Sequence, residues 1–230
     1  YRPAVSGVTH MVSAGHYLAT AAGYRILEEG GNAVDAGVAS GIALNVTMPH
    51  MTGFAGVAPI ILYLAQPQEV VTISGLGQWP QNATLEYFQS KYGEIPAGIM
   101  RSVVPGACDA WLVALERYGT MSFAQVVAPA IELAAQGFPI SHGLADSIRQ
   151  AEAHLAKWSE SCSLFMPRGF PLDVGERLIR GELANLFRKM IDVERTNAYR
   201  GRKRAIRAAR DFFYKEDVAE AMVEFCQQQG

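Results

Sequence analysis

The chain has 230 residues, of which half are hydrophobic and 18% are charged, and its formal net charge at pH 7 is -2. This composition supports one globular domain with a sizeable core and is not that of a disordered or fibrous chain. The nearly balanced charge, with a pI near 6.2, gives no general attraction to nucleic acid or to anionic lipid. We therefore expect neither nucleic acid nor a membrane as a partner.

Cysteine usage and hydropathy bear on the compartment. Cys108, Cys162 and Cys226 are far apart in the sequence, so we expect them to be reduced and mostly buried, without a zinc pair. Polar or helix-breaking residues interrupt each apolar run before it reaches the roughly 20 residues of a membrane span. The chain opens with Tyr1-Arg2-Pro3 and not with a secretory signal. These features favour a cytoplasmic protein, or a periplasmic one whose signal has been removed.

The first hundred residues are rich in Ala, Gly and Val and hold only 3 of the Lys and Arg residues, which indicates a buried, layered core. Residues 10–13 predict a short strand. Helical spacing of apolar residues predicts a helix over 16–27, which Gly30 and Gly31 end. Asn32 then begins a second helix that is apolar on nearly every side, a pattern typical of burial between layers.

A strand pair follows these two helices. Residues 57–64 predict a central strand by their length and β-branched content, and residues 70–74 predict its partner. The 66–69 segment between them has the composition of a turn. Two helices followed by a hairpin suggest helices packed flat on an antiparallel sheet.

The second half of the chain is mainly helical. Residues 107–118, 122–136 and 140–159 predict helices, and the second begins with a capping box formed by Ser122 and Gln125. The tail predicts two or three amphipathic helices over 182–229. We interpret residues 1–230 as a single domain, in which 1–104 form a layer of sheet and helices and 105–230 are mainly helical.

The helical tail is basic. Residues 176–215 hold 12 of the 20 Lys and Arg residues, against 5 Asp and Glu residues. A solvated helical face accounts for this pattern, and an anion or subunit site is the alternative.

The sequence offers no pattern for a metal, a cofactor or a conventional serine hydrolase. Its five His residues do not cluster with Asp or Glu, and neither a phosphate-binding loop nor a Gly-Xaa-Ser-Xaa-Gly motif occurs. We interpret His16 and His50 as buried or half-buried, with His50 the better placed to face a pocket. No cofactor and no metal are expected.

Several segments, in this order and spacing, resemble the γ-glutamyltransferase family of N-terminal-nucleophile hydrolases. The strongest is 26–36, where a helix stop, a glycine turn and an Asn cap follow one another. The other matching segments are 11–20, 48–56, 104–107, 114–119 and 128–134.

This resemblance implies an α+β fold, a four-layer αββα sandwich made from a precursor that cuts itself in two. The new N-terminal Thr of the smaller piece would be the nucleophile, and its own α-amino group the base. Since this chain begins with Tyr1, we expect it to be part of the large subunit and to carry no catalytic residue. The small β subunit bearing the Thr would be its partner, with two such heterodimers forming a dimer.

The resemblance also bears on specificity. Relatives that act on γ-glutamyl compounds carry an Arg that holds the α-carboxylate of the substrate as a planar fork. Alignment on Pro80 places Leu76 at that position. Loss of such a charge pair typically costs on the order of 2–5 kcal/mol of binding, so we expect glutathione-like substrates to be poor.

Seven residues are candidates for contact with substrate: Phe54, Leu76, Gly77, Gln78, Trp79, Arg101 and Ser102. Gln78 offers both a donor and an acceptor to a small amide, and oxamate is the example we favour. For Leu76 and Trp79 the alternative is core packing. Arg101 precedes a glycine turn and could replace the missing cation, or it is a solvated loop residue.

We therefore expect the large subunit of an autoprocessed amidohydrolase that cleaves a small amide other than a γ-glutamyl compound. One alternative is a γ-glutamyltransferase (glutathione hydrolase) or a cephalosporin acylase. Another is a family member with a binding or structural role and no catalysis.

Overall fold

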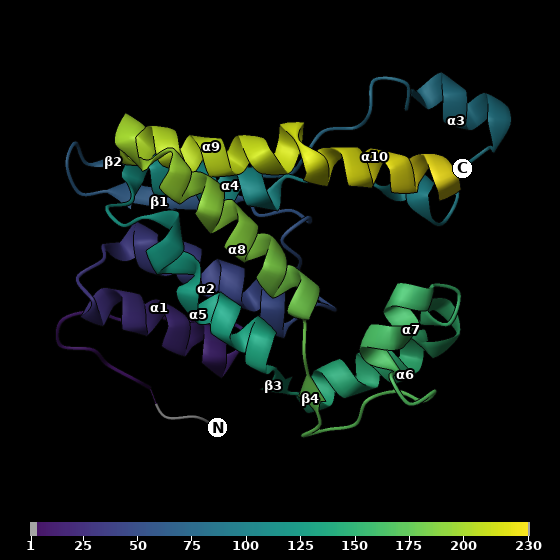
Figure 1. Ribbon diagram of the computed structural model, residues 1–230, viewed down its shortest axis with the longest axis horizontal. Helices are drawn as coiled ribbons and strands as arrows, with labels where there is room; N and C mark the ends of the chain where they lie inside the picture. The colour runs from purple at the N-terminus through teal and green to yellow at the C-terminus, as the bar shows by residue number, and fades with distance from the viewer. Residues whose placement is uncertain (1–3, 230) are drawn as a thin grey trace.

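The computed structural model describes residues 4–229, so Tyr1–Pro3 and Gly230 lie outside the described residues. The chain is mostly helical, with few strands (Figure 1). In chain order the elements are α1 (Tyr17–Glu28), α2 (Ala33–Thr47), β1 (Ile60–Leu64), β2 (Glu69–Ile73), α3 (Leu85–Lys91), the 3-10 helix η1 (Ile99–Arg101), α4 (Ala107–Tyr118), α5 (Phe123–Gln136), β3 (Phe138–Pro139), α6 (His142–Leu155), α7 (Ser159–Phe165), β4 (Arg177–Leu178), α8 (Gly181–Thr196), the 3-10 helix η2 (Ala198–Arg200), α9 (Arg202–Lys215) and α10 (Asp217–Gln229).

Helix α2 is the centre of the core. Helices α1, α4 and α5 pack around it, and its side chains Ala39, Ile42 and Val46 are fully buried. The prediction of a helix buried on nearly every side is confirmed. Gly23 lets α1 approach α2 closely, because a Cβ at Gly23 would lie 2.9 Å from the carbonyl oxygen of Ala36.

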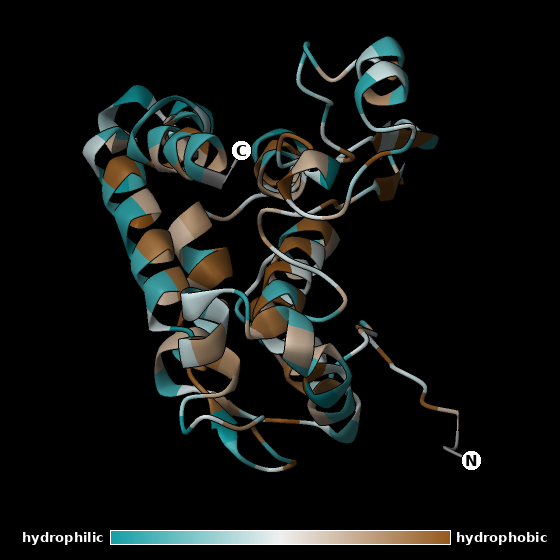
Figure 2. Cartoon of the chain, turned by 90° about the vertical axis from the view of Figure 1, so that its right-hand side faces the viewer, coloured by the Kyte–Doolittle hydropathy of each residue, from teal (hydrophilic) through white to brown (hydrophobic). Residues whose placement is uncertain are grey.

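Helices α8 and α9 pack on the outside of this core, against α4 and α5. Helix α8 packs on α5, and α9 packs on α4 and α8. Figure 2 shows the apolar, brown residues of the helices turned towards one another and the teal residues turned outward. The amphipathic tail predicted from the sequence is thus confirmed as three helices, α8, α9 and α10.

Two helix starts follow the predicted capping chemistry. Asn32 accepts hydrogen bonds from the backbone N–H groups of Val34 and Asp35, while the Asp35 carboxylate accepts one from Asn32 N. At the start of α5, Ser122 and Gln125 form the predicted box. Each box satisfies backbone donors that the first turn of a helix leaves without partners.

Later parts of the chain hold the ends of earlier helices. Glu194 of α8 accepts hydrogen bonds from Phe123 N at 2.6 Å and Ala124 N at 2.8 Å, at the start of α5. Burial raises the pKa of the Glu194 carboxyl, and these two N–H groups act in the opposite direction. Arg202 of α9 donates to four carbonyl oxygens at the end of α4 and the start of the next loop. They belong to Leu115, Glu116, Gly119 and Met121.

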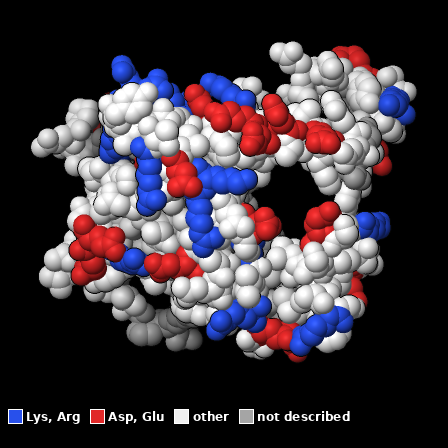
Figure 3. Space-filling model, viewed as in Figure 1, with Lys and Arg blue, Asp and Glu red and all other residues white. Residues whose placement is uncertain are grey.

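The basic tail is therefore partly structural. Figure 3 shows Lys and Arg side chains gathered over α8 and α9, with acidic groups among them. Arg202 caps α4, and Arg207 pairs with the buried Glu116 of that helix. Such contacts make both arginines part of the fold.

Strands β1 and β2 form an antiparallel hairpin in which Ile60 lies opposite Ile73. Its inner face contacts α4 through a small cluster that includes Ala107 and Ala110. The strand pair predicted over 57–64 and 70–74 is confirmed, but β1 is not a central strand among the described residues. Among residues 4–229, β1 pairs only with β2, and burial along it alternates. The four-layer sandwich expected from the resemblance is thus only partly present here.

Two local expectations differ from the structure, and one helix was missed. Residues 10–13 form no strand, and α3 was not predicted. The helix expected over 140–159 is α6, which ends at Leu155, and a turn at 156–158 separates it from α7. Neither Gly nor Pro marks that turn, so the helical pattern runs through it unbroken.

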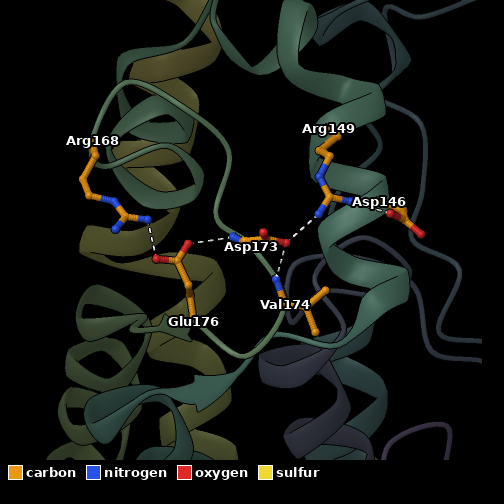
Figure 4. A network of polar contacts seen from close by, with 6 residues as sticks. All are labelled: Asp146, Arg149, Arg168, Asp173, Val174 and Glu176. Carbon is orange, nitrogen blue, oxygen red and sulfur yellow. Dashed lines mark hydrogen bonds and ion pairs between the residues drawn. The ribbon is translucent and has the colours of Figure 1, made fainter.

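A polar network closes the segment between α7 and β4 onto α6 (Figure 4). Arg149 of α6 pairs with Asp146 at 2.5 Å and reaches Asp173 in the loop at 2.6 Å. Arg168 pairs with Glu176, which also accepts a hydrogen bond from Asp173 N. Because these groups are largely exposed, each pair contributes little alone. Backbone hydrogen bonds of Gly175 and Glu176 with Ile140 hold the same segment.

The cysteines are free. Cys108 is buried, Cys162 is half-buried and Cys226 is exposed. The expectation that the cysteines are mostly buried is met in part, and their reduced state stays a prediction. None of the helices in the described part of the chain is long and apolar enough to cross a bilayer.

Candidate functional site

Three backbone segments cross beside the hairpin, and the predicted 75–79 segment is one of them. Gly75 O accepts a hydrogen bond from Ala58 N at 2.9 Å, and Gln78 O accepts one from Val104 N at 2.8 Å. Gly56 O accepts bonds from both Gly106 N and Ala107 N at 2.9 Å, which satisfies donors at the start of α4. The crossing therefore fixes the 75–79 backbone against two other parts of the chain.

Glycine is required at this crossing for two reasons. Gly75 and Gly77 have φ angles of 55° and 77°, in the left-handed region that other residues rarely adopt. A Cβ at Gly77 would lie 2.0 Å from Val104 O, and one at Gly106 would lie 2.4 Å from Gly77 N. A side chain at either position would force the backbones apart.

The side chains of the 75–79 segment point away from the core of this chain. Leu76 is 55% exposed and Trp79 is 45% exposed, and Gln78 is also exposed. The Trp79 ring meets Phe88 of α3 edge-on, with 6.0 Å between ring centroids. Core packing within this chain, the alternative considered for Leu76 and Trp79, is therefore wrong.

The side of the hairpin that faces away from α4 is exposed and largely apolar. We call Ile61, Tyr63, Val70 and Thr72 the outer hairpin face. All four are exposed, and Tyr63 lies opposite Val70 in the strand register. Exposed apolar side chains gathered on one strand face are typical of an interaction surface.

Arg101 and Ser102 lie three and two residues before Val104, on and just after η1. Both are exposed. The Arg101 guanidinium donates to Ile95 O at 3.2 and 3.4 Å, so it is folded onto the loop that precedes η1. As placed, it serves that loop and not the 75–79 segment.

Phe54 is separated from the other candidates. It is buried, and its ring makes edge contacts with Phe187 of α8 at 5.0 Å and Phe213 of α9 at 5.7 Å between centroids. The structure thus gathers Leu76–Trp79 near Val104 but places Phe54 in the core.

The glycine-bearing loop after α2 is held by polar contacts that the sequence did not indicate. The buried Asn45 donates to Thr52 Oγ1 at 2.7 Å and accepts a hydrogen bond from Trp111 Nε1 at 3.1 Å. Arg180 donates to Asn45 O at 2.5 Å and so caps the end of α2. A single Asn within an apolar helix was the only signal for this arrangement.

Tyr214 of α9 was also missed. Its hydroxyl donates to Pro105 O at 2.8 Å and accepts a hydrogen bond from Asp109 N at 3.0 Å. More than 100 residues separate these partners, so no local pattern could have revealed the contact.

The two singled-out histidines are at least partly buried, and burial lowers the pKa of both rings. His16 Nδ1 accepts a hydrogen bond from Leu18 N at the start of α1, so His16 has a structural role. His50 Nδ1 is buried and has no hydrogen-bond partner among the described residues.

The described residues contain no group of three or more His, Cys, Asp or Glu side chains that could hold a metal ion. What the site does offer is a hydrogen-bonded, closely packed backbone crossing that presents Leu76, Gln78 and Trp79. Such an arrangement can line a pocket and orient a substrate amide.

Comparisons with known proteins agree with the sequence motifs. A family model described as gamma-glutamyltranspeptidase matches residues 19–230. The chain is 35% identical over 230 residues to a glutathione hydrolase-like YwrD proenzyme of Bacillus subtilis. The matched region covers 98% of this chain and 40% of that relative. The chain is also 37% identical over 209 residues to an acylase ACY 1 proenzyme of a Pseudomonas strain. That match covers 86% of this chain and 37% of the relative.

The fold agrees as well. The crystal structure of gamma-glutamyltranspeptidase from Helicobacter pylori superposes with a TM-score of 0.84 at 27% identity, over 98% of this chain and 62% of that one. The chain thus spans about two fifths of the length of the curated relatives it matches.

Proposed function

Because this chain belongs to the gamma-glutamyltranspeptidase family, we propose that it is the large-subunit part of an autoprocessed amidohydrolase acting on a small, oxamate-like amide. The nucleophile in this proposal is the N-terminal Thr of a second chain cut from the same precursor, with its α-amino group as base. These 230 residues supply a wall of the substrate pocket and the helices that hold it. The proenzyme names of the two relatives support the processing step.

Leu76 is the observation that carries the choice of substrate. It stands where the resemblance places the carboxylate-binding Arg, and its exposed side chain has no charge to offer. Without a fork of N–H donors, an α-carboxylate entering a shielded pocket loses its partner, at a cost of about 2–5 kcal/mol. Small amides without this group suffer no such loss.

The outer hairpin face supports the need for a second chain. Its exposed Ile61, Tyr63 and Val70 would be covered if a second sheet layer packed on the hairpin. In the proposal this layer comes from the small subunit, and two heterodimers form the complete protein in its compartment, the cytoplasm.

The first experiment expresses the full precursor and follows its cleavage by mass spectrometry. The proposal predicts two chains, the smaller of which begins with Thr. Changing that Thr to Ala should abolish both cleavage and hydrolysis. Oxamate, a γ-glutamyl anilide and an acyl β-lactam are then compared as substrates of the processed protein. A marked preference for the γ-glutamyl anilide would contradict the proposed specificity.

The second experiment uses Leu76→Arg. A guanidinium at this exposed position should raise kcat/KM for a γ-glutamyl anilide by at least about tenfold, because it restores a charge-assisted partner for the carboxylate. Leu85→Arg is the matched control, since Leu85 is similarly exposed but lies on α3. Equal gains in both variants would show that the effect is one of net charge and not of position.

An acylase that acts on β-lactams is the second candidate. The Pseudomonas acylase relative and the apolar pair Leu76 and Trp79 both favour it. Faster hydrolysis of the acyl β-lactam than of oxamate would decide for it. A precursor that is never cleaved would instead indicate the binding or structural role.

A further inference from the structure

The hydroxyl group of Tyr214 links α9 to the backbone crossing. Its hydroxyl oxygen donates to Pro105 O and accepts from Asp109 N, at 2.8 and 3.0 Å. The Asp109 N–H belongs to the first turn of α4, where Gly106 provides no side-chain cap. One hydroxyl thus holds both the turn before α4 and the first turn of the helix.

The turn that Tyr214 holds is the support of the 75–79 segment. Val104 N, one residue before Pro105, donates to Gln78 O, and Gly106 packs directly on Gly77 N. Gly106 N also donates to Gly56 O. A displacement of Pro105 would therefore move Val104, which bonds to Gln78, and Gly106, which packs on Gly77.

The hydroxyl is suited to a permanent contact. Burial raises the pKa of the Tyr214 phenol, so it keeps the proton that it donates to Pro105 O. The charged groups that face it are Asp109 and Arg210, which act on its pKa in opposite directions, and the nearby thiol of Cys108 is itself buried. The ring packs on Phe213 with 4.9 Å between centroids.

We propose that Tyr214 is a positioning residue for substrate binding, which sets the place of the 75–79 segment through Pro105 and Val104. This inference rests on the proposed function for its effect on catalysis, but its structural part does not. In this proposal Tyr214 acts on the substrate only through Pro105 and Val104. It therefore determines how well the pocket wall fits the substrate and leaves the chemical step unchanged.

The kinetic test uses Tyr214→Phe in the full, processed protein with its best amide substrate. Loss of the hydroxyl should raise KM by about three- to tenfold, because the wall binds ground state and transition state alike. The value of kcat should stay within about twofold for the same reason. Tyr199→Phe is the control, since Tyr199 is 85% exposed and forms no part of the crossing. A fall in kcat at unchanged KM would overturn the proposal.

A second measurement needs no activity. Amide hydrogen exchange at Val104 should become about five- to tenfold faster in Tyr214→Phe, because its bond to Gln78 O opens more often. The amides of Ile42 and Ala43 in α2 should be unchanged. Equal acceleration in α2 would show a general loss of stability, and no change at Val104 would show no link; either result overturns the proposal. If the wild-type protein cleaves no amide, the proposed function fails, while this exchange result still decides the role of Tyr214.

Discussion

The helical core and the outer hairpin face differ in whether their side chains find partners within this chain. In the core, the fully buried Asp35 carboxylate accepts hydrogen bonds from the N–H groups of Asn32, Thr120 and Met121 and from the Thr120 hydroxyl. On the hairpin, by contrast, Ile61 is 73% exposed although it is apolar. The core has its partners within this chain, whereas the hairpin face has groups that a partner could still use.

This difference separates two kinds of sequence constraint. Core residues such as Asp35 are fixed by contacts that the chain makes with itself, so their replacement should affect folding. Residues of the outer hairpin face should affect assembly, and the exposed side chains of the 75–79 segment should affect substrate choice. The glycines of that segment, which pack within this chain, should instead affect its stability. Three substitutions in the full protein test that separation.

The largest effect is expected for Asp35→Ala. It leaves three backbone N–H groups without their acceptor and removes the reciprocal cap of α2, which should cost about 3–5 kcal/mol of unfolding free energy. Urea denaturation would measure the loss. Asp192→Ala, at a largely exposed position of α8, should change stability by less than about 0.5 kcal/mol. A loss at Asp35 as small as that would show that the network contributes little.

A smaller effect, on assembly, is expected for Ile61→Asp. If the small chain covers the outer hairpin face, a buried carboxylate there should weaken the contact between chains by about 2–3 kcal/mol. The urea concentration at which the two chains separate would report this weakening. Val8→Asp places the same charge at a fully exposed position outside the hairpin and should have no effect. Unchanged separation in Ile61→Asp would mean that the face stays in water.

The smallest effect is expected for Gly77→Ala, measured against Gly93→Ala. The two glycines have φ angles of 77° and 74°, but only Gly77 is crowded by Val104 O, and nothing lies within 4 Å of a Cβ at Gly93. Both variants bear the cost of a left-handed alanine, so their difference isolates the crossing. We expect the free energy of unfolding, measured by urea denaturation, to be about 1–2 kcal/mol lower for Gly77→Ala than for Gly93→Ala. Equal losses would show that the crossing yields easily.

Much of the helical fold could be predicted because its signals are local. Gly30, Asn32 and Ser122 each mark a helix end by their own chemistry, and all three ends occur as expected. The errors arise where tertiary contacts decide. Residues 10–13 have strand composition, but no strand within 4–229 pairs with them, and the turn at 156–158 carries no helix-breaking residue.

The candidate site was predictable only in part. The sequence pointed to the 75–79 segment through Leu76, and the structure shows why its glycines are needed. The sequence did not show that Phe54 lies apart from this segment, since a ring beside glycines can face either a pocket or the core, and here α8 and α9 supply core partners. Whether the seven candidates bind substrate stays a prediction.

The ends of α4 and α5 have a consequence for biosynthesis. Both helices leave the ribosome well before Glu194 and Arg202, the two residues that bond to the start of α5 and the end of α4. Until these later side chains emerge, Phe123 N, Ala124 N and the carbonyl groups that Arg202 binds lack these partners. Because such distant contacts close slowly, the core should reach its final arrangement late in translation, once α8 and α9 have been made.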